Sequence, residues 1–211
     1  MATENQEYTI PISSGNQRLD AQLKFTAEIN KMTSVLRRTL LLDKSRCEND
    51  AEHSWHIAVM ALLFEEYAKE KVDLCHAVEM LLVHDLIEIY AGDTFAYDTV
   101  ANKSKKQRED DAAKRLFAIL PDDQAEYIKS LWIEFDCGVT NEAKYANCMD
   151  KLQPFFHNIM TKGHTWQNAD IPVSKKQVEN RMACVKEFMP QLYIWVEKSI
   201  SAAAERQWLS I

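Results

Sequence analysis

The sequence predicts an all-α protein. Its 211 residues include only four glycines and five prolines, so few tight turns are available and long helices are favoured over many short strands. Apolar residues recur at helical spacing along most of the chain, and strand-like alternation is nearly absent. No repeat or linker-like stretch divides the chain. We therefore expect a single domain of about eight helices over residues 1–211, with 1–16 as an irregular lead-in.

The composition is that of a globular protein and excludes several classes of function. Hydrophobic residues make up 46% and charged residues 27%. No apolar run reaches the ~18–20 residues that cross a bilayer, and the start lacks the regions of a signal peptide. The five cysteines form no Cys-x-x-Cys pair, so we expect reduced thiols in a cytoplasmic protein. The net charge of -7 and the lack of a basic stripe argue against nucleic acid as a partner.

Helix boundaries in the first half follow from spacing and capping. We expect the first helix over 17–42, where apolar residues recur at helical spacing. Asn49 followed three residues later by Glu52 is typical of a capping box and predicts the start of the second helix. Asp73 can cap a third helix, which is expected to run through Tyr90 and to be buried on nearly every side.

The second half repeats these signals. Ser104 with Gln107 predicts a capping box for a helix over 104–120, and a further helix over 121–135 is stopped by Gly138.

The C-terminal part is expected to be helical as well. A helix over 141–160 contains Pro154, which is expected to kink it. Ser174 with Gln177 opens another helix, and 191–208 forms the last one.

The adjacent residues His84 and Asp85 lie inside the predicted third helix. A charged carboxylate on a buried helix face is costly unless it is paired, and a divalent metal is the obvious partner. Imidazole and carboxylate together suit first-row divalent ions better than calcium. The alternative is a hydrogen-bonded core histidine beside a buried capping carboxylate.

Three further residues in predicted helices are candidates for the same site: His53, His56 and Asp150. The chain lacks the ligand spacing of a structural zinc site, a His-Glu-x-x-His helix, a glycine-rich phosphate loop and a Gly-x-Ser-x-Gly elbow. No histidine lies between Thr94 and Met149, which favours one metal ion over two.

Three segments together resemble the HD-domain metal-dependent phosphohydrolases, and most of all the 5'-deoxynucleotidases and the HD-domain-containing protein 2 family. They are residues 46–54 (RCENDAEHS), residues 84–93 (HDLIEIYAGD) and residues 144–152 (KYANCMDKL), and they span about half the chain. The resemblance implies a helical HD domain with one divalent ion. The metal ligands that it implies are His53, His84, Asp85 and Asp150.

The same resemblance gives Glu88 a catalytic role, to position or deprotonate the attacking water. Glu88 lies four residues after His84 and is expected on the same helix face. The alternative is a carboxylate that only orients a ligand histidine. The resemblance gives His56 no metal role, and we expect it to pack beside the cleft.

Two residues are expected to contact substrate. By the resemblance, Asp93, which follows Gly92, contacts a sugar hydroxyl, and Arg38 lies at the phosphate and the sugar. The alternatives are a turn residue and a surface arginine. Thr39 stands where many family members carry an aromatic residue that excludes the ribose 2'-hydroxyl, so the sequence does not predict a strict preference for deoxyribose.

The expected function is metal-dependent hydrolysis of a phosphomonoester, most of all a (deoxy)ribonucleoside 5'-monophosphate. The resemblance favours Co²⁺ or Mn²⁺, with Mg²⁺, Fe²⁺ or Zn²⁺ also compatible with these ligands. It also implies a homodimer and a small-molecule nucleotide as the partner. The alternatives are another HD-domain phosphohydrolase or phosphodiesterase, a non-catalytic nucleotide-binding regulatory module, and a helical interaction protein.

Overall fold

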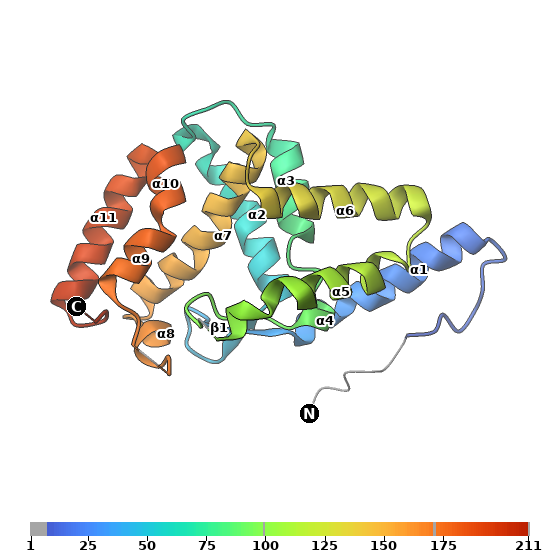
Figure 1. Cartoon of the computed structure of the whole chain (residues 1–211), viewed down its shortest axis with the longest axis horizontal. Coiled ribbons are helices and arrows are strands. Elements are labelled where there is room, and N and C mark those ends of the chain that lie inside the picture. The colour runs from blue at the N-terminus through green and yellow to red at the C-terminus, as the bar shows by residue number, and fades with distance from the viewer. Residues whose placement is uncertain (1–7, 99, 171, 211) are drawn as a thin grey trace.

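A long central helix organises the fold. The computed structural model describes residues 8–98, 100–170 and 172–210. The central helix, α7 (Asn141–Met160), packs against α2 (Asp50–Phe64), α3 (Leu74–Val83), α6 (Asp122–Cys137) and α10 (Ala183–Phe188). It runs through the middle of Figure 1. Its residues Tyr145, Ala146 and Met149 are fully buried, so its packing defines the core beside the candidate site.

The other elements surround α7 and its neighbours. The remaining helices are α1 (Gln17–Ile29), α4 (Glu88–Ala91), α5 (Lys105–Phe117), α8 (His164–Gln167), α9 (Lys175–Arg181) and α11 (Pro190–Glu205). Short 3₁₀ helices cover Asn30–Ser34, Glu65–Tyr67 and Ala101–Lys103. In Figure 1 the C-terminal helices α9 to α11 lie on one side of α7, and α1 and α5 lie on the other.

The all-α class is confirmed, apart from one small antiparallel sheet. β1 (Leu36–Leu40) pairs with β2 (Cys47–Asn49), and Leu36 lies opposite Asn49. The predicted helix over 17–42 is therefore wrong in its second half, because α1 ends at Ile29. The helical spacing of apolar residues is a local signal, whereas β1 depends on a partner strand that follows it in the chain.

The predicted third helix is also divided. α3 ends at Val83, His84 is its C-cap residue, and α4 begins only at Glu88. The Leu81 carbonyl, which would accept the Asp85 N–H in a continuing helix, accepts the Nδ1–H of His84 at 2.9 Å. The His-Asp pair consequently lies at a helix corner and not inside a helix.

Two of the three predicted capping boxes are confirmed. Asn49 with Glu52 opens α2, and Ser174 with Gln177 opens α9. The box predicted at Ser104 is wrong, because its side chain makes no capping hydrogen bond to α5.

The remaining boundary signals hold. Asp73 accepts from the His76 N–H and so caps α3, and Gly138 ends α6 in the left-handed conformation. Pro154 lies within α7 and does not end it. The predicted last helix over 191–208 corresponds to α11, which begins at Pro190 and ends at Glu205. Of the lead-in expected over 1–16, residues 8–16 are irregular, and residues 1–7 lie outside the described residues.

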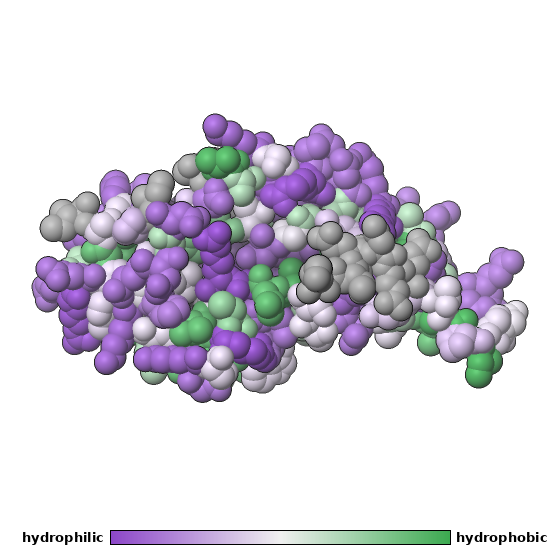
Figure 2. Space-filling view, turned by 90° about the horizontal axis from the view of Figure 1, so that it is seen from below, coloured by the Kyte–Doolittle hydropathy of each residue, from purple (hydrophilic) through white to green (hydrophobic). Residues whose placement is uncertain are grey.

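The described surface is largely polar on the face seen in Figure 2, where apolar groups form small separate patches. None of the helices in the described ranges is both long and apolar enough to cross a membrane. All five cysteines carry free thiols, as expected from the sequence.

Candidate active site

The four predicted metal ligands come together at one point in the core. Nitrogen and oxygen atoms of His53 (α2), His84 (the end of α3) and Asp150 (α7) all lie within 4.8 Å of one another. His53 Nε2 is 3.3 Å from Asp150 Oδ1, and His84 Nε2 is 3.8 Å from the same oxygen. Asp85 Oδ2 lies 3.1 Å from His84 Nε2 and 4.0 Å from His53 Nε2.

Hydrogen bonds on the far side of each imidazole determine which nitrogen faces this point. His84 Nδ1–H donates to the Leu81 carbonyl, and His53 Nδ1–H donates to Gln153 Oε1 at 3.0 Å. Both Nε2 atoms therefore carry lone pairs toward Asp150. His84 Nε2 is buried without a hydrogen-bond partner among the described residues. The ring of Phe135 packs 4.7 Å from the His84 ring, centroid to centroid, and holds its orientation.

This donor set fits a divalent cation. Burial, followed by the charge of Arg37, lowers the pKa of His53 to about 4, so its imidazole is neutral near pH 7. A neutral nitrogen lone pair then faces a carboxylate oxygen at 3.3 Å, which is repulsive unless a cation lies between them. For His84, burial lowers the pKa, but Asp85 and Asp150 outweigh it and raise the pKa overall. A proton on His84 thus competes with a metal ion for the same lone pair.

Arg37 is the cation that the structure itself places among the carboxylates. Its Nη1 lies 2.8 Å from Asp85 Oδ2, 3.3 Å from Asp50 Oδ1 and 4.0 Å from Asp93 Oδ1. Its Nε lies 3.4 Å from Glu48 Oε1. Burial opposes its charge, but these carboxylates hold the pKa of Arg37 well above its usual value. The side chain is only 11% exposed, so Arg37 serves as an internal counter-ion.

Glu88 and Asp93 form a second acidic group with Asp50. Oxygens of these three side chains lie within 4.8 Å of one another. Burial, together with the charges of Asp85 and Asp50, raises the pKa of Glu88 well above its usual value. Burial and Asp85 raise the pKa of Asp50 to about 8. Oε2 of Glu88 and Oδ2 of Asp50 have no hydrogen-bond partner among the described residues.

A buried polar network supports His53 from behind. Gln153 Nε2–H donates to Glu48 Oε2 at 2.7 Å, while Gln153 Oε1 accepts from His53. Gln153 Nε2 also lies 3.3 Å from His56 Nδ1 and 3.1 Å from His157 Nε2. The structure thus places His56 in the network behind His53, where it contacts Gln153 and His157.

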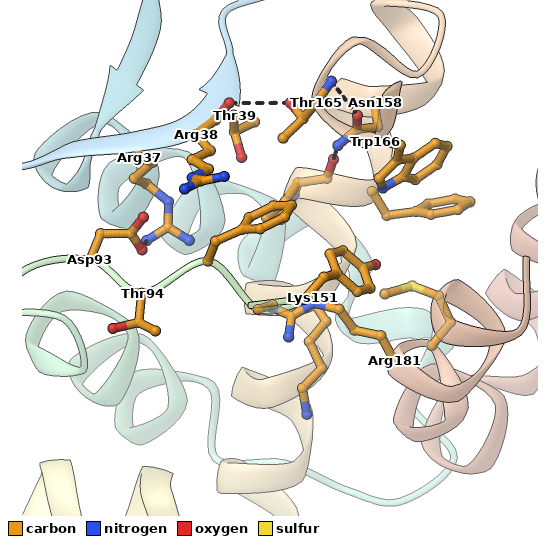
Figure 3. A pocket seen from close by; sticks show the side chains of 16 residues that line it. Arg37, Arg38, Thr39, Asp93, Thr94, Lys151, Asn158, Thr165, Trp166 and Arg181 are labelled. Carbon is orange, nitrogen blue, oxygen red and sulfur yellow. Dashed lines mark hydrogen bonds and ion pairs between the residues drawn. The ribbon is translucent and has the colours of Figure 1, made fainter. Parts of the chain in front are cut away.

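A cavity of about 250 Å³ opens beside the ligands and is called the metal-side cavity here. Its lining includes His84, Asp85, Glu88, Asp93, Lys105, Asp150, Lys151 and Arg181. A second hollow, the aromatic pocket, is lined by Arg38, Phe95, Tyr97, Phe155 and Trp166 (Figure 3). Arg37, Asp93, Lys151 and Arg181 line both, so the two hollows meet along these side chains.

Arg38 lies at the aromatic pocket and not at the metal ligands. Its guanidinium carbon is 5.1 Å from the centroid of the Phe95 ring, and Nη1 is 3.6 Å from Asp170 Oδ2. Because neighbouring residues on a strand point to opposite faces, Arg37 enters the carboxylate group whereas Arg38 turns away from it. Asp93 lines both hollows.

Sequence reasoning missed Arg37, Asp50 and Gln153. Asp50 follows the N-cap of α2, a position that is usually explained by the helix dipole alone. Gln153 lies three residues after Asp150, so helical spacing could have placed it on the same face. The role of Arg37 depends on β1, which the sequence did not predict.

A model of the HD domain family matches residues 29–192 of this chain. The chain is 42% identical, with a TM-score of 0.88, to the crystal structure of a predicted metal-dependent phosphohydrolase from Magnetospirillum magnetotacticum MS-1, and the match covers 95% of this chain and 100% of the other.

Curated relatives match over a shorter range. The 5'-deoxynucleotidase HDDC2 of Bos taurus is 34% identical over 106 residues, 50% of either chain. The protein of the same name from Homo sapiens is 32% identical over 108 residues, 51% of this chain and 52% of the relative. The chain thus spans about half the length of the curated relatives it matches.

Proposed function

Because the chain belongs to the HD domain family, we propose that it is a metal-dependent phosphohydrolase that releases phosphate from (deoxy)ribonucleoside 5'-monophosphates. The names of its relatives, a predicted metal-dependent phosphohydrolase and 5'-deoxynucleotidases, support this reaction class. The observation that carries the proposal is the convergence of two imidazole lone pairs on Asp150, beside an open cavity lined by Glu88.

The proposed ligands are His53, His84, Asp85 and Asp150, and the proposed ion is a single Co²⁺ or Mn²⁺. Mixed imidazole and carboxylate donors suit these ions and also accept Mg²⁺, Fe²⁺ or Zn²⁺. When bound, such an ion supplies polarisation of a phosphoryl oxygen and a lower pKa for a bound water. Arg37 meanwhile holds Asp85 in place through its 2.8 Å contact.

Glu88 is proposed to orient the attacking water and to take its proton. Glu88 lines the metal-side cavity together with His84, Asp85 and Asp150, so its carboxylate lies beside a water that the cavity would hold next to these ligands. Asp93 lines the same cavity and the aromatic pocket, which suits a contact with a sugar hydroxyl. Arg38, at the aromatic pocket, is placed for the sugar or base end of the substrate.

The wider assignments are proposals as well. We propose that residues 1–211 form one HD domain, that the protein is a homodimer and that it acts in the cytoplasm. Exposed Trp55 on α2, with Ile194 and Trp195 on α11, supports the dimer, and the free thiols support a reducing compartment.

Phosphate release from matched substrates tests the function. The substrates are ribo- and deoxyribonucleoside 5'-monophosphates, each with Co²⁺, Mn²⁺, Mg²⁺ and Zn²⁺. We expect turnover by the wild type, and a fall of about 10² or more in kcat for Glu88→Gln, which keeps size but removes the base. Glu66→Gln, at an exposed glutamate in the 3₁₀ helix that follows α2, is the matched control. If none of these substrates releases phosphate with any of the four metals, the proposal is overturned.

A further inference from the structure

Two cations lie where the metal-side cavity and the aromatic pocket meet, and neither is within ion-pair distance of a carboxylate of the described residues. Lys151 (α7) and Arg181 (α9) line both hollows. In the described part of the chain neither forms an ion pair, and the only side-chain hydrogen bond of Lys151 runs from Nζ to Asn147 Oδ1 at 3.2 Å. Figure 3 shows Arg181 reaching from α9 toward the centre of the pocket, whereas the amino group of Lys151 on α7 points away from that centre.

The other cations around these hollows already have partners. Arg37 contacts Asp85, Asp50 and Glu48. Lys105 Nζ lies 3.4 Å from Glu109 Oε1. Arg38 Nη1 lies near Asp170, as described above. Lys151 and Arg181 therefore offer the positive charge that is left for a ligand.

The charge balance identifies the kind of ligand. Arg37 is engaged by Asp85, Asp50 and Glu48, whereas Lys151 and Arg181 line the cavity beside the proposed metal ligands without an ion pair among the described residues. Two open cations then remain, and a phosphate monoester carries about 1.5 to 2 negative charges at pH 7. A phosphate diester carries only about one charge, because its second acidic oxygen is esterified.

We propose that Lys151 and Arg181 bind the phosphoryl group and make the site selective for terminal phosphomonoesters over diesters. This inference rests on the proposed function, since it assigns the phosphate end of the same substrate. The planar fork of Arg181 can hold two phosphoryl oxygens at once, and Lys151, next to Asp150 in the chain, supplies a point charge on the metal side. Arg38 is then left to the other end of the substrate.

Hydrolysis of two chromogenic esters tests the selectivity. The probes are 4-nitrophenyl phosphate and bis(4-nitrophenyl) phosphate with the Mn²⁺-loaded protein. We expect Arg181→Met and Lys151→Met each to lower kcat/KM for the monoester about ten- to a hundredfold and to change that for the diester about twofold or less. Lys176→Met, at an exposed lysine on the same helix as Arg181, is the matched control and should match wild type.

Binding of inorganic phosphate gives a readout without turnover. In titration calorimetry on the Mn²⁺-loaded protein, we expect both variants to bind phosphate about tenfold more weakly or worse, with unchanged Mn²⁺ affinity. Arg181→Lys, which keeps the charge, should fall between wild type and Arg181→Met and serves as the test if Arg181→Met does not fold.

The two proposals fail differently. Monoester hydrolysis with unaltered KM and phosphate affinity in both methionine variants would overturn the phosphate-binding pair and leave the function standing. Phosphate binding that depends on Arg181, in a protein that hydrolyses no phosphomonoester, would overturn the function and leave the pair standing.

Discussion

Gln153 Oε1 accepts the Nδ1 proton of His53 at 3.0 Å and so fixes the nitrogen that His53 presents to the metal ligands. The amide is itself oriented, because its Nε2–H donates to the buried Glu48 at 2.7 Å. Hydrogen bonds of this kind set the tautomer and the direction of a ligating imidazole.

Gln153→Leu is therefore expected to weaken Mn²⁺ binding about ten- to a hundredfold, because His53 loses the acceptor that fixes its tautomer. Titration calorimetry with Mn²⁺ measures the change. Gln22→Leu removes a comparable amide hydrogen bond to Gln124, far from the site, and should leave the Mn²⁺ affinity unaltered. Equal affinities for wild type and Gln153→Leu would show that Gln153 does not position His53.

Arg37→Met is expected to destabilise the metal-free protein by about 3–5 kcal/mol, because it leaves several buried carboxylates without their cation. Urea unfolding in the presence of a chelator measures the free energy of unfolding. Arg18→Met removes an arginine whose bidentate pair with Asp123 is exposed, and we expect little change there. Similar losses for the two variants would contradict the counter-ion role of Arg37.

Mn²⁺ is expected to raise the melting temperature of the wild type, because an ion that binds only the folded state adds about 2.7 kcal/mol at a hundred times its Kd. His53→Ala should abolish most of this shift, since it removes one converging lone pair. His164→Ala, at an exposed histidine, should keep it. A full shift in His53→Ala would show that the ion binds elsewhere.

Ser174→Ala is expected to cost about 1 kcal/mol of stability, because the Ser174 hydroxyl accepts from the Gln177 N–H at the start of α9. Ser104→Ala should cost little, because that side chain does not cap α5. Chemical denaturation of the two variants provides the comparison. Equal costs would mean that the two serines do not differ as caps.

The pair of His76 and Glu134 links α3 to α6 and should make stability depend on pH. His76 Nε2 lies 2.8 Å from Glu134 Oε2, and the hydrogen bond to Glu134 raises the pKa of His76 above 6.5. Because the pKa of His76 is higher in the folded than in the unfolded protein, the pair stabilises the folded state when the pH is below the unfolded-state pKa. This stabilisation disappears as the pH rises through the folded-state pKa.

His76→Ala should therefore destabilise the protein more at pH 5.5 than at pH 8.5. Unfolding free energies of wild type and variant at both pH values measure the difference, which should be small because the pair is only partly buried. A larger cost at pH 8.5 would contradict the direction of the pKa shift.

The sequence predicts the fold class and the four proposed ligands because both are indicated by local sequence patterns. Helical spacing identifies α2, α7 and α11, and His53, the His84-Asp85 pair and Asp150 lie in short recognisable segments. It does not predict the β1–β2 sheet or the corner after α3. The sheet depends on pairing with the strand that follows β1, and the corner depends on a side chain that hydrogen-bonds to a backbone carbonyl in place of a backbone N–H.

The site residues that the sequence did not predict also depend on contacts between separate elements. The cleft brings together side chains from β1, α7 and α9, namely Arg37, Lys151 and Arg181. These residues are far apart in the sequence, and no local sequence spacing indicates that they come together. Gln153 differs from these residues, because its position three residues after Asp150 in one helix predicts that both side chains lie on the same face.

The internal counter-ion has a consequence for how the protein is made. Arg37 offsets much of the carboxylate charge before any ion is present, so the chain can complete its folding first and acquire its metal afterwards. Loading then resembles an exchange at a finished site, in which the ion competes with a proton for His84, whose pKa the neighbouring Asp85 and Asp150 raise. An empty molecule can then stay folded, with the lower stability of the metal-free state, and the supply of metal sets how many copies are active.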